Sequence, residues 1–271
     1  MIKFESFEHY YHKNGLKVIT KSFTVVLILS SSLCQFSFAQ SSREIVTQSA
    51  EWFALTSNIK LHKHLSLLAE GQFRYTGSFN PMQFQFRTGV EVHINKQLSI
   101  MPLGYVYSWN PIYGKLPALY VNNEHRIFEQ VVFKHSVGRV TLSHRGRLEQ
   151  RYVQVHVNNN GEVINEGYDL FMNRARYRFM MNIPINHSKM EPKTIYISAY
   201  DEAFFSWGKK VTYDEPDQNR IFAGLGYQLN KKLSAQGGFF YQMLIKSNGK
   251  QQENNVGFQV QLIYNIDLTK N

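Results

Sequence analysis

Apolar and polar residues alternate along several segments of about a dozen residues each. The clearest segment is 82–94, where every second residue from Met82 onward is apolar or Thr88, and the residues between them are Gln, Arg, Gly, Glu and His. A period of two residues is the period of side chains on a β-strand, whereas a helix repeats every 3.6 residues. The pattern predicts a strand with one apolar face and one polar face.

The same alternation recurs over most of the chain and predicts an all-β fold. It is strong in residues 65–75, 140–152, 174–181, 233–245 and 254–266, and weaker in residues 51–61, 123–133, 194–207 and 220–229. Residues 98–109 are apolar on both faces and include Pro102, but their length also favours a strand.

The connections between these strands alternate between short and long. Short turns are expected near residues 62–63, 95–97, 136–139 and 230–232, and long loops near 110–120, 156–168 and 209–218. Thirteen residues at ~3.3 Å each, tilted by ~45°, cover about 30 Å, the thickness of a bilayer core. The pattern therefore predicts a transmembrane up-and-down antiparallel β-barrel.

The number of recognised segments is odd. Eleven segments are recognised, whereas bacterial single-chain barrels normally have an even number of strands. We expect about 12 strands, with a short additional strand within residues 41–48, and 10 strands as the alternative.

A soluble sandwich or a lipocalin-like barrel shows the same alternation and is the competing fold. Charge placement favours the membrane barrel. The full chain of 271 residues has 30 Lys and Arg against 20 Asp and Glu; beyond residue 39, every Lys lies in a turn, a loop or a strand end, while ten of twelve Arg lie within strands, on the polar face. Arg without Lys indicates an enclosed polar lumen, where planar guanidinium groups satisfy several acceptors at once.

Aromatic residues near the strand ends also favour the membrane barrel, because they match the interfacial girdles of such barrels. They are Tyr75, Tyr107, Trp109, Tyr152 and Trp207.

The first 39 residues have the pattern of a secretory signal peptide. Lys17 and Lys21 precede an apolar run at 23–29, and Ser37-Phe38-Ala39 resembles a cleavage site. We expect residues 1–39 to be removed and residues 40–271 to form one barrel in the cell outer membrane. No stretch approaches the ~18 consecutive apolar residues of a transmembrane helix, and the single cysteine, Cys34, excludes a disulfide framework.

Fifteen charged residues are predicted to face the lumen and to form a charge network. They are Glu70, Arg74, Arg87, Glu91, Glu124, Arg126, Arg145, Arg147, Glu149, Arg151, Arg174, Arg176, Arg178, Glu202 and Arg220. A turn centred on Val137-Gly138 pairs residues whose numbers add up to 275. That register places Glu124 opposite Arg151, Arg126 opposite Glu149, and Gln130 opposite Arg145. Two interpretations remain open: a salt-bridged plug that holds the barrel rigid, and an anion-binding constriction.

The polar-face motifs of the chain resemble an uncharacterised family of Gram-negative outer-membrane proteins, catalogued as a domain of unknown function (DUF2490). The matching positions are Trp52, 72–74, 104–107, 124–126, 145–151, 174–177, Glu202, 219–220 and 224–227, and residues 145–151 are the most specific of them. The resemblance implies an outer-membrane β-barrel with no established activity, so no catalytic residue is carried over. Residues 255–262 are also similar to the signal read by barrel-assembly machinery.

The expected function is a narrow channel or a structural component of the envelope; the alternative is an outer-membrane enzyme acting on lipids or envelope polymers. Ser143 and His144 are adjacent on one strand and point to opposite faces, so they cannot act together as nucleophile and base. We predict no catalytic residues, metal or cofactor. The expected partners are outer-membrane lipids and the assembly machinery, and not nucleic acid, because basic loops beside anionic headgroups account for the net positive charge. The oligomeric state is left open.

Overall fold

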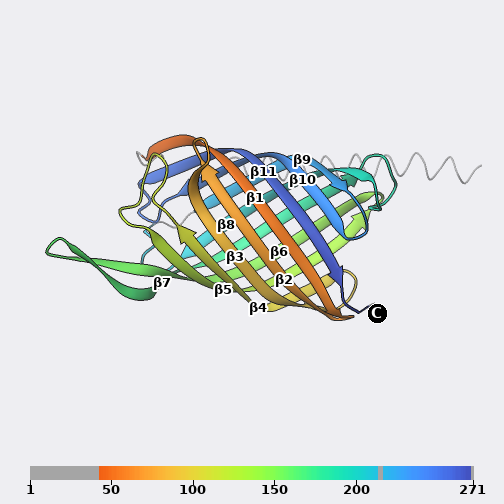
Figure 1. The fold of residues 1–271 in the computed structure, drawn as a ribbon, viewed down its shortest axis with the longest axis horizontal. Coiled ribbons are helices and arrows are strands. Elements are labelled where there is room, and N and C mark those ends of the chain that lie inside the picture. Colours follow the sequence, from red (N-terminus) through yellow and green to blue (C-terminus); the bar gives the residue numbers. More distant parts are fainter. Residues whose placement is uncertain (1–42, 213–215, 270–271) are drawn as a thin grey trace, which may run out of the picture. The chain divides into compact units, whose positions relative to one another are not determined.

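The computed structural model describes residues 43–212 and 216–269, and these residues form one closed β-barrel (Figure 1). The strands are β1 (Glu44–His62), β2 (Leu65–Thr76), β3 (Asn80–His93), β4 (Leu98–Asn110), β5 (Asn122–Val137), β6 (Val140–Asn159), β7 (Glu162–Pro184), β8 (Thr194–Trp207), β9 (Gln218–Gln228), β10 (Leu233–Ile245) and β11 (Gln251–Asp267). Within these residues there is no helix long and apolar enough to cross a membrane. The predicted signal peptide, residues 1–39, lies outside the described residues.

The barrel closes by a parallel pair. Each strand from β1 to β10 pairs antiparallel with the next one along the chain, and β1 then pairs parallel with β11, from Glu44 opposite Gln251 to Lys60 opposite Asp267. An odd number of alternating strands brings the first and last strands together in the same direction, so the closing pair has to be parallel.

The predicted all-β antiparallel barrel is confirmed, with eleven strands in the described residues, one fewer than the expected number of about 12 and one more than the alternative of 10. Residues 44–48 do not form a separate strand, because they run without interruption into β1. Residues 98–110 are a true strand, β4. The register of β4 against β5 shifts between Met101 and Gly104, where Pro102 has no N–H to donate to a ladder.

One predicted loop is instead a strand pair. Residues 156–168 continue β6 and β7 as an extended hairpin that projects beyond the neighbouring strands (Figure 1). The hairpin turns at Asn160-Gly161, and both residues have positive φ, 50° and 94°. Asn followed by Gly is the preferred pair for such a turn, since both tolerate the left-handed region.

The two faces of the barrel wall differ in the way the alternation predicts. Each of the eleven strands exposes large apolar side chains on the outside; Leu103 of β4 is 61% exposed and Phe239 of β10 is 79% exposed. The positions between them point inward and carry charge, and Glu124 and Glu202 are only 2% and 1% exposed. The barrel is thus apolar outside and charged inside, the reverse of a soluble barrel.

Apolar side chains also enter the interior in two small clusters. One contains Trp52, Phe222 and Phe240 with Ala50 and Tyr200, and the Trp52 and Phe240 rings stack at 4.0 Å between centroids. The other contains Met101, Val106 and Phe128. The Phe128 ring lies directly against the backbone of Gly104, where a Cβ atom would overlap it.

This contact makes Gly104 a sensitive position. We expect Gly104→Ala to lower the free energy of unfolding by about 1–3 kcal/mol, because Phe128 is fully buried and cannot move aside without strain. The matched control is Gly71→Ala in β2, where the added Cβ would meet only the Phe73 ring at 3.6 Å. Denaturant unfolding of the barrel in detergent measures both variants, and equal effects would contradict the packing argument.

Candidate functional site

The polar positions of the strands bring the predicted charged residues to the inside of the barrel. Ten of the fifteen are buried, and Arg74, Arg145, Arg151 and Arg178 are half-buried and line interior cavities. Glu91 is also half-buried and accepts a hydrogen bond from Ser99 Oγ at 2.5 Å. The side chains meet in three ion-paired groups, each built around one or two glutamates.

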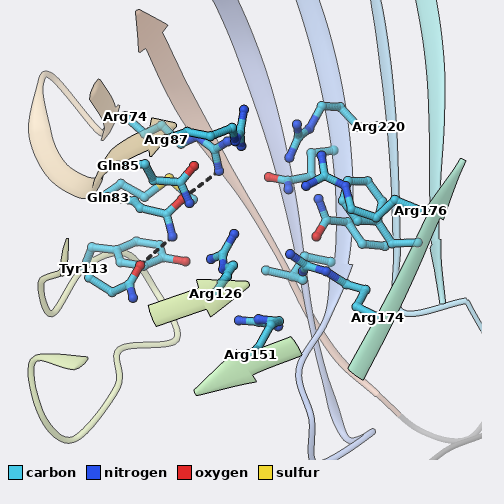
Figure 2. A pocket seen from close by; sticks show the side chains of 16 residues that line it. Arg74, Gln83, Gln85, Arg87, Tyr113, Arg126, Arg151, Arg174, Arg176 and Arg220 are labelled. Carbon is cyan, nitrogen blue, oxygen red and sulfur yellow. Dashed lines mark hydrogen bonds between the residues drawn. The ribbon is translucent and has the colours of Figure 1, made fainter. Parts of the chain in front are cut away.

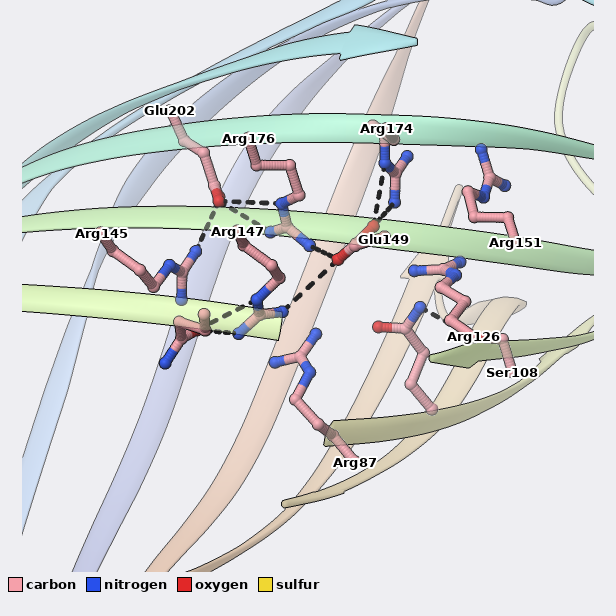
Figure 3. A network of polar contacts seen from close by, with 12 residues as sticks. Arg87, Ser108, Arg126, Arg145, Arg147, Glu149, Arg151, Arg174, Arg176 and Glu202 are labelled. Carbon is pink, nitrogen blue, oxygen red and sulfur yellow. Dashed lines mark hydrogen bonds and ion pairs between the residues drawn. The ribbon is translucent and has the colours of Figure 1, made fainter. Parts of the chain in front are cut away.

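Glu149 of β6 and Glu202 of β8 form the largest group, and Arg176 of β7 joins them (Figure 3). Arg176 donates from Nη1 to Glu149 at 2.6 Å and from Nη2 to Glu202 at 2.7 Å. Arg174 donates a further bond to Glu149 at 2.6 Å, and Arg145 one to Glu202 at 2.5 Å. Three neighbouring strands are therefore cross-linked inside the barrel.

Glu124 of β5 is the centre of the second group. Arg126 donates to both of its oxygens, at 2.6 and 2.8 Å, and Arg151 of β6 does the same at 2.5 and 3.1 Å. Two paired forks occupy this carboxylate, an arrangement that satisfies a buried charge well. The third group is the ion pair between Glu70 and Arg87, which Thr56 and Gln72 support by donating to the same carboxylate.

The predicted register of this region is wrong by two residues. In the structure Glu124 lies opposite Val153, and Arg126 lies opposite Arg151. The turn is centred on Gly138-Arg139 rather than Val137-Gly138, because Gly138 takes the positive φ of 59° at the first turn position.

The contacts change accordingly. Arg151 still reaches Glu124, but diagonally. Glu149 pairs with Arg174 and Arg176 across the next strand, whereas the prediction paired it with Arg126. Gln130 accepts from Arg147 at 2.5 and 3.0 Å, whereas the prediction placed it opposite Arg145.

Two of the ten arginines, Arg74 and Arg178, have no carboxylate within ion-pair distance among the described residues. Arg74 donates to the side-chain Oε1 atoms of Gln72 and Gln83, both at 2.7 Å, and lies 4.3 Å over the Trp52 ring. Arg178 lies 5.6 Å from the centre of the Tyr200 ring. These two guanidinium groups therefore contact neutral amide and aromatic side chains.

Aromatic rings under the arginines are the part of the site that the sequence reasoning missed. Arg147 lies 4.2 Å over Phe128, and Arg176 lies 4.6 Å over Phe204. Such cation–π contacts are favourable, more so where water is excluded. Phe128 has the same inward parity as Arg126 and Gln130, so the alternation of residues along β5 could have placed it inside the barrel.

Two cavities in the interior of the described barrel meet at a layer of arginine. The first has a volume of about 120 Å³ and lies near the strand ends that carry the loop at residues 111–121 (Figure 2). The second has a volume of about 500 Å³ and extends to the opposite rim. We refer to them as the loop-side and turn-side cavities. Four residues line both: Arg74, Arg87, Arg176 and Arg220.

The loop at 111–121 is fastened to the loop-side cavity by polar contacts. Tyr113 lines the cavity and donates from its hydroxyl to Glu253 at 3.1 Å, and Lys246 pairs with the same carboxylate at 2.6 Å. Burial raises the pKa of Tyr113, and the negative charge of Glu253 raises it further. Tyr113 therefore stays a neutral donor.

Ser143 and His144 lie on opposite faces of β6. Ser143 lines the turn-side cavity, and His144 lies on the outer surface, where its Nδ1 is 2.7 Å from the Tyr177 hydroxyl. Across the described part of the chain, no group of three or more His, Cys, Asp or Glu side chains could hold a metal ion.

A family model described as "Protein of unknown function (DUF2490)" matches residues 50–254. The chain belongs to this family. No curated protein matches the chain at a significant level.

Three solved structures are similar in fold. The NanC porin has 9% identity, with 76% of this chain and 94% of that chain covered and a TM-score of 0.43. The β domain of the Bordetella autotransporter BrkA has 10% identity, with 67% and 78% covered and a TM-score of 0.36. The siderophore receptor PirA from Pseudomonas aeruginosa has 10% identity, with 68% and 32% covered and a TM-score of 0.27.

The pair of Glu124 and Arg151 provides a test of the buried network. In a double-mutant cycle with Glu124→Gln and Arg151→Gln, we expect a coupling energy of about 1–3 kcal/mol, because Glu124 is buried, Arg151 is mostly buried and the two share two hydrogen bonds. The control cycle uses the exposed pair of Lys210 and Asp169, at 2.9 Å, for which we expect about 0–1 kcal/mol. Denaturant unfolding in detergent gives both values, and equal coupling in the two cycles would mean that the lumen pair is solvated.

Proposed function

We propose that this chain is an outer-membrane β-barrel whose charged lumen is a narrow passage for small solutes. The observation that carries the proposal is the inverted wall, with large apolar side chains exposed on all eleven strands and carboxylates and guanidinium groups inside. In water, an apolar surface around the whole circumference would be an aggregation hazard. In a bilayer it is the surface that lipid chains cover, and a closed barrel leaves no unpaired strand edge.

The strand lengths agree with a membrane-spanning barrel. The shortest strand, β9, has 11 residues. At ~3.3 Å per residue and a tilt of ~45°, such a strand spans about 25 Å, the height of the apolar band of these barrels.

Aromatic side chains on the outer wall near both rims support the same placement. Near the loop-bearing rim, Trp109 stacks on Phe84 at 5.3 Å between centroids. Towards the opposite rim, His144 stacks on His135 at 5.4 Å and lies near Phe133. Rings at these depths match the interfacial girdles of membrane barrels, and longer loops usually face the cell exterior. On that basis the loop-side cavity faces outward from the cell.

The lumen is narrow because its side chains fill most of it. The two cavities, about 120 and 500 Å³, meet only where Arg74, Arg87, Arg176 and Arg220 lie. The ion pairs that brace the wall also leave little room for a solute. The packed, ion-paired side chains therefore make the barrel rigid and, at the same time, leave only a narrow passage through it.

The location is tested by fractionation. We expect the protein in the outer-membrane fraction, and we expect unheated detergent extracts to shift in mobility on gels after boiling, because a closed barrel resists detergent until it is heated. Recovery as a soluble periplasmic monomer would contradict the membrane proposal.

The passage is tested in planar bilayers. We expect the wild-type protein to show small or no single-channel conductance. The double variant Arg74→Ala with Arg220→Ala should conduct more, because it removes two of the four side chains at the junction of the cavities. Arg178→Ala, which widens only the turn-side cavity, is the control. Large, stable conductance of the wild type would rule out the narrow lumen.

A further inference from the structure

We infer that the loop-side cavity is a binding site for the carboxylate, sulfate or phosphate group of a small solute. The inference deepens the proposed function and rests on it in one respect: the solute reaches the cavity from the loop-bearing mouth of the barrel.

The lining of the cavity is cationic without a carboxylate. Seven arginines surround it, and in Figure 2 they come from several strands on different sides of one space: Arg74, Arg87, Arg126, Arg151, Arg174, Arg176 and Arg220. The other polar lining residues, Gln83, Gln85, Asn110, Tyr113, Gln218 and Gln242, are neutral. Glu124, Glu149 and Glu202 pair with several of these arginines, yet none of the three lines the cavity.

Some of the donors at the cavity are buried and have no partner. The Nε atoms of Arg87 and Arg220, at the junction of the two cavities, lack a hydrogen-bond acceptor, and these side chains are only 6% and 8% exposed. A buried charged donor without an acceptor costs free energy, so such atoms are normally satisfied by something. A bound oxyanion or ordered water supplies the missing acceptor.

The charge balance distinguishes an anion from water. The predicted lumen set has ten arginines against five glutamates, and Asp217, buried near the same rim, adds one negative charge. The ion pair of Lys246 with the buried Glu253 adds no net charge. A surplus of about four positive charges remains inside a wall that lipid would surround. Uncompensated charge in such an enclosure is costly, and neutral water does not compensate it.

The chemistry of the guanidinium group defines the ligand class. Its planar fork donates two parallel hydrogen bonds to a carboxylate, sulfate or phosphate, and a cluster of forks binds a dianion from several sides. A cavity of about 120 Å³ holds one such group but not a large sugar. Inorganic phosphate is therefore the simplest probe.

The test is titration calorimetry of the folded barrel in detergent with inorganic phosphate, at pH 8 and constant low ionic strength. We expect the wild type to bind phosphate and Arg74→Gln to bind it about tenfold more weakly, since one charged donor at the cavity is lost. The matched control is Arg178→Gln: it removes the same charge from another arginine that lacks a carboxylate partner, but it lines only the turn-side cavity. This control should stay within about twofold of the wild type.

The outcomes separate the inference from the proposed function. Absence of phosphate binding by the wild type, or equal weakening by both variants, would overturn the assigned site. If Arg74→Gln does not give a heat-modifiable barrel, Arg220→Gln takes its place, since Arg220 lines the same cavity and lies 3.6 Å from its nearest carboxylate.

Calorimetry in detergent does not depend on conductance or on membrane location. Binding by a protein that fractionates outside the membrane would therefore refute the proposed function and leave the site standing.

Discussion

The pairing of guanidinium and carboxylate groups away from water is the interaction on which the rest of this barrel depends. Glu149, Glu202 and Arg176 join the adjacent strands β6, β7 and β8, and Glu124 joins β5 to β6. Each group would be too costly to bury alone, because the loss of hydration exceeds what any single contact returns. The network is therefore stable only as a whole, and its strands are held in one register by the same contacts that compensate the charges.

Much of the fold could be predicted from the alternation of residues. Period two identifies the strands and their inward faces, and it correctly assigns Arg174, Arg176 and Arg178 to one side of β7 because parity along a strand does not depend on its neighbours. Register does depend on neighbours. A single choice, whether Gly138 is the first or the second turn residue, moves every cross-strand pair of β5 and β6 by two positions while leaving the faces unchanged.

Other features could not be predicted from the local composition of the sequence. The Gly- and Asn-rich segment 156–168 resembles a loop, yet its backbone groups pair within a hairpin. The merging of residues 44–48 into β1 depends on β11, some two hundred residues away in the sequence. The same is true of Tyr113, whose place at the loop-side cavity depends on Glu253 of β11. Each of these features depends on contacts that no local window contains.

The parallel closure of β1 on β11 has a consequence for sidedness. β1 starts at the loop-bearing rim, where Arg43 donates to the carbonyl of Gly249, and β11 finishes at the opposite rim, where the Leu268 amide donates to the carbonyl of Lys60. In a barrel with an even number of strands both ends would leave on one side. Here, a reporter domain joined just before β1 and another joined just after β11 would lie at opposite rims of the barrel, and a linker that circularised the chain would have to traverse the full height of the wall.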